Sequence, residues 1–366
     1  MKAGGRWLIG QSFDSMLLQF ARALSSQTNT YHCMHRISVY LIAACCLALS
    51  ACINEDLSDC GYNYGLEYQV TLTTNVQTEI KTELTTEAEV EVGQKLMQAL
   101  SGFFAEYAND VDLNFYTLAP PQELRHNEYH FIGGSSASYS IYLPAEDYRH
   151  LSVANVSGEE TVNIQANSHA SLFNMIQVAG DTVPSHTFGL FSARRDMQVL
   201  GDMDQVFHVS LYMQNCAAAL VVDPKGVEHE GMQVYLNGLA TGFTVNDSTY
   251  IYKDSPVVRT HRLEVDCPLL CNYGMSFPSP ASQADMVPAG RDAADASLWY
   301  IKAYVTMPDG SITETTLSIP TPLKAGQLRI VKAYMLPNGG LTPVDAEVGA
   351  SVELDWKQGG IYEPEL

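Results

Sequence analysis

The sequence predicts an all-β protein that carries one short amphipathic helix. Many short segments alternate apolar and polar residues, which is typical of half-buried strands. Glycine, proline, asparagine and aspartate recur about every ten positions between these segments, as turns require. Helical spacing occurs clearly in one stretch, so the crossover helices of a parallel α/β fold are missing. These observations favour β-sandwiches.

An apolar run near the start of the chain has the features of an export signal. Residues 37–51 carry no charge, but they are fewer than the roughly 20 apolar residues that a membrane-spanning helix needs. His35 and Arg36 precede the run, and Leu49-Ser-Ala-Cys52 closes it. This order predicts a signal peptide over residues 1–51, cleavage after Ala51 and lipid, palmitate included, on the sulfur of Cys52.

Two alternatives stay open for this segment. Residues 1–33 are either an over-extended gene start, with translation beginning at Met34, or an unusually long basic leader. A cytosolic protein with a buried apolar helix is the alternative to export. Under the export reading, residues 52–65 form an acidic, lipidated tether, and the mature chain is anchored to a membrane without spanning it.

Composition limits the class of protein. Residues 1–51 hold four of the 20 Lys and Arg residues and one of the 41 Asp and Glu residues, which leaves 16 basic and 40 acidic side chains and a net charge near −24. Such a surface repels phosphates, so no nucleic acid partner is expected. About 315 mature residues favour two domains. We place them at residues 66–215 and 216–366.

The first half begins with a predicted strand, Leu66–Thr73, in which every second residue is apolar. Apolar residues then fall at helical spacing over residues 94–107, and this helix is expected to pack on the sheet. Further strands are predicted over residues 111–115, 139–143 and 151–153.

The second half repeats this pattern across the boundary near residue 215. The turn at Pro308-Asp-Gly310 predicts a hairpin, because proline presets φ and glycine accepts a positive one. Residues 279–296 are expected to form a surface loop. Predicted strands cover residues 206–213, 216–222, 232–236, 243–245, 299–307, 315–319, 328–331 and 352–356.

Four cysteines remain beside Cys52 after removal of the signal: Cys60, Cys216, Cys267 and Cys271. An even number in an exported chain permits disulfides, and the sequence leaves all three pairings open. Cys267 and Cys271 could also form a local clip or a metal pair. No metal site is expected, because the histidine pair at ligand spacing lies far upstream.

No sequence motif for catalysis or cofactor binding is present, so neither an enzyme nor a cofactor is expected. The pair His126 and His130 is interpreted as part of a solvated linker between strands, and His229 as part of a charged loop. The acidic run over residues 87–91 is expected to cap or solvate the helix. A hydrolase with two distant carboxylates stays an alternative. The tyrosines are expected to lie on strand surfaces, with a sugar-binding platform as the alternative.

The segment Cys52-Ile-Asn-Glu-Asp-Leu-Ser-Asp-Cys60, followed by an alternating strand, resembles the FimB-type minor fimbrial anchor family of Bacteroidetes. Weaker similarities follow along the chain: a helix after the first strand, Tyr-Ser-Ile-Tyr-Leu-Pro at 139–144, Ala-Ala-Leu-Val-Val at 218–222, and a terminal Trp356. The resemblance implies two tandem transthyretin-like β-sandwich domains, the helix lying in the first.

The resemblance also implies a surface-exposed lipoprotein of the cell outer membrane at the base of a fimbrium. Its partners would be fimbrial stalk subunits joined by donor-strand exchange, and it would limit fimbrial length. In related stalk subunits an arginine-specific cut removes the first strand. No arginine lies between Cys52 and Arg125, although Lys81 could serve a lysine-specific protease. The alternative function is a surface glycan-binding lipoprotein of a polysaccharide-uptake system.

Overall fold

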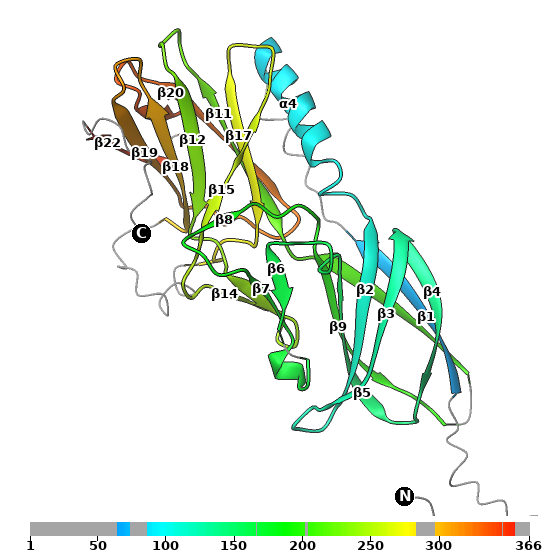
Figure 1. Ribbon diagram of the computed structural model, residues 1–366. Helices are drawn as coiled ribbons and strands as arrows, with labels where there is room; N and C mark the ends of the chain where they lie inside the picture. The colour runs from blue at the N-terminus through cyan, green and yellow to red at the C-terminus, as the bar shows by residue number, and fades with distance from the viewer. Residues whose placement is uncertain are drawn as a thin grey trace, which may run out of the picture. The chain divides into compact units, whose positions relative to one another are not determined.

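Strands make up nearly all the regular structure of the residues that the structure describes (Figure 1). The structure is a computed structural model that describes residues 64–73, 86–165, 167–201, 204–282, 297–345 and 347–355. Within these ranges there is one α-helix, α4 (Glu87–Leu100), and a single 3-10 turn, η1 (Ala170–Leu172). The prediction of an all-β fold with one helix is therefore confirmed. The predicted signal segment and the tether before residue 64 lie outside the described residues.

A seven-stranded sheet contains most of the strands of the first half. Alternate residues of its second strand, Val111, Leu113 and Phe115, are fully buried in a shared apolar core. The two strands at the edges of this sheet lie close to each other, as the stacked rings of His130 on one and Tyr139 on the other show, with centroids 4.1 Å apart. In spatial order the strands are β3 (Leu124–Gly134), β2 (Ala108–Thr117), β5 (Asp147–Ala154), β9 (Phe191–Gln198), β10 (Gln205–Met213), β1 (Tyr64–Thr73) and β4 (Ser136–Leu143).

Two further sheets face each other across a second core, centred on the fully buried Trp299. The indole Nε1 of Trp299 donates a hydrogen bond to the Thr321 carbonyl at 3.0 Å, so the one polar atom of this large side chain is satisfied. One sheet has the order β16 (His261–Leu263), β17 (Leu270–Ser276), β11 (Cys216–Asp223), β20 (Leu328–Met335) and β21 (Leu341–Pro343). The other has the order β22 (Gly349–Asp355), β19 (Ile312–Ile319), β18 (Trp299–Thr306), β12 (Gly231–Asn237), β15 (Val257–Arg259) and β8 (Thr182–Pro184).

A small four-stranded sheet packs on the outer face of the seven-stranded sheet. Phe173 and Phe243 lie in one buried cluster with Tyr116 and Leu151. The strand order is β14 (Thr249–Ile251), β13 (Gly242–Thr244), β7 (Asn174–Gln177) and β6 (Val162–Ile164). This sheet and the six-stranded sheet each combine strands from both sides of residue 215. The predicted boundary at 215/216 stays a prediction.

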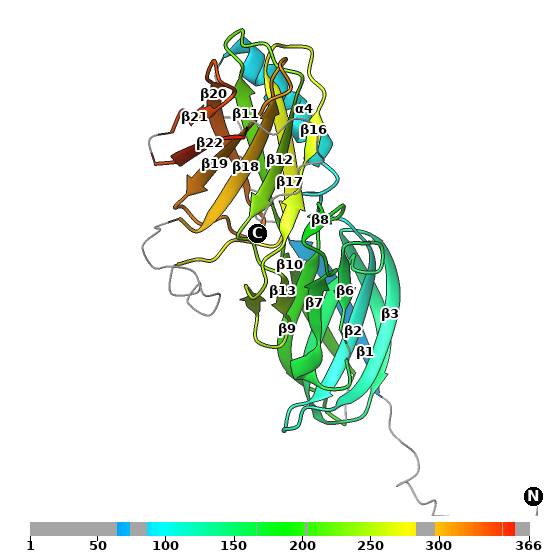
Figure 2. The same ribbon diagram turned by 60° about the vertical axis from the view of Figure 1, so that its left-hand side comes forward.

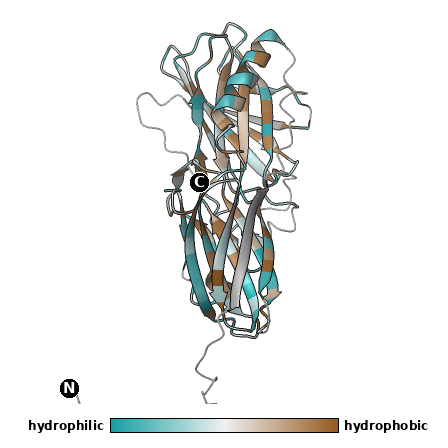
Figure 3. Ribbon diagram, turned by 90° about the vertical axis from the view of Figure 1, so that its right-hand side faces the viewer, coloured by the Kyte–Doolittle hydropathy of each residue, from teal (hydrophilic) through white to brown (hydrophobic). Residues whose placement is uncertain are grey.

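The helix differs from its prediction in both position and partner. It was expected over residues 94–107, but it begins at Glu87, because Thr86 accepts from the Glu89 N–H while the Glu89 carboxylate accepts from the Thr86 N–H. The helix packs on the five-stranded sheet of the second half (Figures 1 and 2). Lys95 pairs with Asp266 at 2.8 Å, beside strand β17. The helix carries both hydrophilic and hydrophobic residues (Figure 3), and its buried residues Val92, Leu96 and Leu100 recur four apart on one face, as an amphipathic helix requires.

Both faces of β11 are buried as a consequence. Leu220 points into the core around Trp299, whereas Ala219 lies in the cluster that contains Leu96 of the helix. On the helix side of β11 two of the three buried side chains, Ala217 and Ala219, are small, which leaves room for the helix close to the strand. A helix near the start of the described chain therefore covers a sheet whose strand β11 begins some 130 residues further along the sequence.

Most predicted strands are confirmed, and the hairpin at Gly310 is also confirmed, with φ of +79° and β19 antiparallel to β18. The predicted linker around His126 and His130 is wrong, because these residues belong to strand β3. This strand carries polar side chains on both faces, as its place at the edge of the sheet allows, and local periodicity therefore does not reveal it.

Candidate functional site

Strand β1 occupies an internal position in the seven-stranded sheet although it opens the described chain. It pairs in parallel with β10, from Leu66 opposite Gln205 to Thr73 opposite Tyr212, and antiparallel with β4 on its other side. Its neighbours therefore come from positions some 70 and 140 residues further along the sequence. A strand of this kind fills a slot between two others through main-chain hydrogen bonds, and another chain could supply the same bonds.

Strands β3 and β4 form the two edges of this sheet, and each pairs with only one strand among the described residues. The outward-facing residues on them include large rings: Tyr129 and Phe131 on β3 are 59% and 73% exposed, and Tyr142 on β4 is 56% exposed. The phenol of Tyr139 donates to the Phe131 carbonyl at 3.3 Å, one link between the two edges. Exposed apolar edges are the geometry that strand addition uses.

The three described cysteines are free of disulfides with one another. Cys216 is fully buried in the core around Trp299, and burial raises the pKa of its thiol. Cys271 faces the opposite side of the five-stranded sheet, and burial raises its pKa to about 12. Cys267 donates to the Ala88 carbonyl of the helix at 3.7 Å. Cys52 and Cys60 lie outside the described residues, so lipidation and any pairing of Cys60 stay predictions.

One carboxylate joins the two histidines of strand β3. Glu128 Oε1 lies 2.6 Å from Nε2 of His126, and Glu128 Oε2 lies 2.7 Å from Nε2 of His130. Spacing of two residues along a strand places these three side chains on one face. No group of three or more His, Cys, Asp or Glu side chains in the described part of the chain has the geometry to hold a metal ion. The cluster instead links neighbouring positions of an edge strand.

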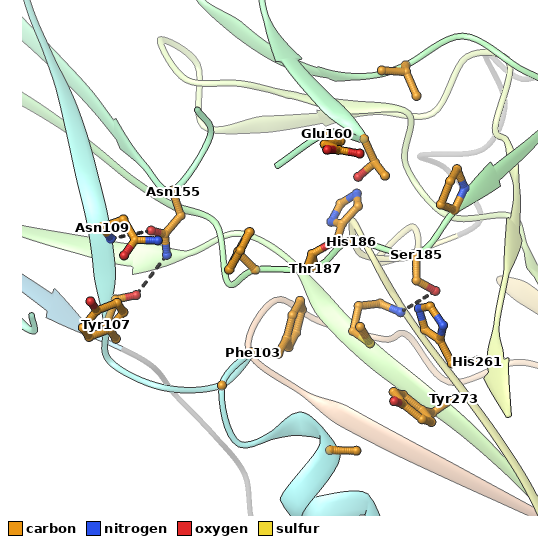
Figure 4. A pocket seen from close by; sticks show the side chains of 17 residues that line it. Phe103, Tyr107, Asn109, Asn155, Glu160, Ser185, His186, Thr187, His261 and Tyr273 are labelled. Carbon is orange, nitrogen blue, oxygen red and sulfur yellow. Dashed lines mark hydrogen bonds between the residues drawn. The ribbon is translucent and has the colours of Figure 1, made fainter. Parts of the chain in front are cut away.

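A cavity of about 650 Å³ lies where the segment after the helix meets the loops before β6 and β9 (Figure 4). Phe103, Tyr107 and Tyr273 contribute aromatic rings to it, while Glu160 and His186 contribute polar groups. The sequence analysis did not single out this group, because the residues are scattered over 170 positions without a common motif.

The backbone around the cavity is held by the buried carboxylate of Glu159. Its Oε1 accepts from the N–H and hydroxyl of Thr161 at 3.2 and 2.6 Å. Its Oε2 accepts from the N–H groups of Thr187 and Phe188 at 2.5 and 3.0 Å. With four donors on one carboxylate that is 3% exposed, Glu159 joins the loop before β6 to the loop that carries His186.

His186 is fully buried, and its hydrogen bonds define its tautomer. The amide oxygen of Asn215 accepts from the Leu190 N–H at 3.0 Å, so the amide nitrogen faces the Phe188 carbonyl and His186 Nδ1. Nδ1 therefore accepts, and the proton sits on Nε2. Burial lowers the pKa of His186 to about 4, against the opposing charge of Glu159, so the ring is neutral at pH 7.

No helix in the described ranges is long and apolar enough to cross a membrane. No protein-family model matches the chain, and no curated protein matches its sequence.

Several solved structures resemble the fold at low sequence identity. A protein from Bacteroides ovatus, provisionally described as an adhesin, is 10% identical with a TM-score of 0.47, over 81% of this chain and 96% of that one. The fimbrial anchor protein Mfa2 from Porphyromonas gingivalis is 12% identical with a TM-score of 0.45, over 79% and 98%. A protein from Parabacteroides distasonis, provisionally described as a cell adhesion protein, is 11% identical with a TM-score of 0.44, over 82% and 99%. At scores below 0.5 these likenesses carry no information on function.

Proposed function

We propose that this chain is an outer-membrane lipoprotein that anchors a surface fimbria, limits its length and joins the stalk by β-strand addition. The role is structural rather than enzymatic. The observation that carries the proposal is the position of β1. This strand follows directly on the tether that begins at Cys52, and it lies between β10 and β4 as an inserted strand.

An anchor must keep its lipid on the chain that holds the stalk. Because no arginine lies between Cys52 and Arg125, an arginine-specific protease leaves β1 attached to the lipidated end. Retention of β1 keeps its slot filled. The stalk subunit would then pair at an open edge of the protein instead, for which the exposed rings on β3 and β4 supply apolar contacts.

The proposal is tested by mass spectrometry of the protein recovered from intact outer membranes. We expect an amino-terminal peptide that begins with diacylated Cys52 and runs unbroken through Lys81. Treatment with an arginine-specific protease should leave this peptide joined to the fold. Mature protein that begins after Thr73 on intact cells would contradict the proposal, because lipid and stalk attachment would then lie on separate chains.

A further inference from the structure

A hollow of about 390 Å³ lies on the outer face of the seven-stranded sheet, over strands β9 and β10. Ser192 and Arg194 of β9 line it together with Ser210 and Tyr212 of β10. Ser192 lies opposite Tyr212 in the ladder, and Arg194 and Ser210 are two residues away on their strands, so all four side chains share one face. The side chains between them lie in the core. Ser248, in the turn between β13 and β14, completes the site, which we call the Arg194 hollow.

The charges at the Arg194 hollow leave a guanidinium group without a counter-charge. Arg149 donates to both carboxylate oxygens of Asp196, at 2.5 and 3.1 Å, so these two charges offset each other. Arg195 donates to a main-chain carbonyl of β10. Arg194 is exposed, and it takes part in none of the ion pairs within the described part of the chain. The one further carboxylate next in sequence to a lining residue is Asp247, so two guanidinium groups remain against one carboxylate.

This local excess of positive charge contrasts with the rest of the protein. The chain as a whole has a net charge of −21, so its general field repels anions. An anionic ligand is therefore favoured at the Arg194 hollow and not over the surface at large. A guanidinium group is planar and pairs best with a carboxylate, through two parallel hydrogen bonds.

Hydroxyl groups and one ring make up much of the remaining lining. Ser192 is 4% exposed, and its hydroxyl forms no hydrogen bond with another described residue. The hydroxyls of Ser210 and Ser248 are equally without a hydrogen-bond partner among the residues that the structure describes. Tyr212 is 52% exposed, so much of its ring is accessible to a ligand. These groups match the hydroxyls and the C–H face of a sugar ring.

The geometry favours a sugar over an extended peptide. Where Ser192 faces Tyr212, the main chains of β9 and β10 pair with each other, so this part of the sheet offers side chains and not a free edge for strand addition. A volume of about 390 Å³ falls within the usual range for small-ligand sites.

We propose that the Arg194 hollow binds a carbohydrate residue that carries a carboxylate, such as a uronic or a sialic acid. The Arg194 guanidinium donates to the carboxylate, sugar hydroxyls bond with Ser192 and Ser248, and the C–H face of the sugar packs on the Tyr212 ring. This binding activity is additional to the anchoring role and does not depend on it.

The test uses the purified full-length protein in nonionic detergent on an array of neutral, carboxylated and sulfated glycans, followed by calorimetry with those that bind. We expect binding of carboxylated glycans alone, and Arg194→Gln should weaken it about tenfold or more. Arg194→Lys should recover only part of the affinity, because an ammonium group cannot form the paired hydrogen bonds. Arg262→Gln is the matched control, since its side chain is 53% exposed outside the hollow, and it should bind as the unaltered protein does.

Two further readouts separate the contacts. Tyr212→Ala should weaken binding about tenfold, whereas Tyr334→Ala, 40% exposed and outside the hollow, should not. Added salt should weaken binding by the unaltered protein more than the residual binding by Arg194→Gln, because salt screens the charge pair.

Binding of neutral or sulfated glycans in place of carboxylated ones, capture of acidic peptides without any glycan, or equal losses in the control variants would overturn the proposal. So would an array without any carboxylated ligand, together with no binding of millimolar glucuronate, galacturonate and N-acetylneuraminate in equilibrium dialysis.

Discussion

The buried carboxylate of Glu159 offers the most direct test of how the cavity is built. In the Glu159→Gln variant one of its two oxygens becomes an amide NH₂ group, which cannot accept a hydrogen bond. If the remaining oxygen stays with Thr161, the N–H groups of Thr187 and Phe188 lose their acceptor. A buried donor without a partner costs about 1–3 kcal/mol. Because Thr187 is an exposed residue, the full cost is not counted for both N–H groups, and we expect the free energy of unfolding to fall by about 3 kcal/mol.

The assay is urea unfolding followed by circular dichroism, with linear extrapolation to water. Glu160→Gln is the matched control, because it makes the same chemical change at the next residue, which is exposed and has no hydrogen bond with a described residue. That variant should stay within about 0.5 kcal/mol of the unaltered protein. Equal free energies of unfolding for the two variants would refute the reasoning that Glu159 holds the two loops together.

Three further predictions concern the helix and the buried histidines. Leu96→Ala should cost about 2–5 kcal/mol in urea unfolding because Leu96 is fully buried against the sheet, whereas Met97→Ala, 44% exposed, should cost almost nothing; equal losses would contradict the packing of α4. Thr86→Ala should cost about 1 kcal/mol through loss of the helix cap, and no change would place the start of the helix elsewhere. Burial lowers the pKa of His150 to about 3 and that of His186 to about 4, so below pH 6.5 the unfolded chain binds protons that the folded chain does not. The free energy of unfolding should therefore fall from pH 6.5 toward pH 4 by about 1.4 kcal/mol per pH unit for each ring. A smaller slope in the His150→Leu variant is the check.

The fold class followed from the sequence because half-buried strands leave a period of two in the residues themselves. Strands β10 and β19, whose buried residues alternate with more exposed ones, were found in this way, whereas the hairpin at Gly310 followed from its turn residues. The predicted helix begins too far along the chain. The sequence pattern presents residues 87–91 as an acidic run before the helix, whereas Thr86 and Glu89 form the capping box of its first turn. Strand β3 was missed because an edge strand tolerates polar residues on both faces.

Long-range contacts could not be predicted from local pattern. The parallel pairing of β1 with β10 joins positions some 140 residues apart, and periodicity carries no information on which strands become neighbours. The cavity could not be predicted from the sequence for the same reason. His186 stands in a loop with no motif around it, and its free Nε2 is evident only once Asn215 is seen to hold the other nitrogen.

The central claim is that a lipid on Cys52 holds a fimbria to the cell. The most direct test counts fimbriae and measures their length, both on cells and in the medium, for the native strain and a Cys52→Ala strain. The account predicts that in the variant strain fimbriae are released into the medium and are longer than native ones. Fimbriae of normal length that remain on the variant cells would contradict it.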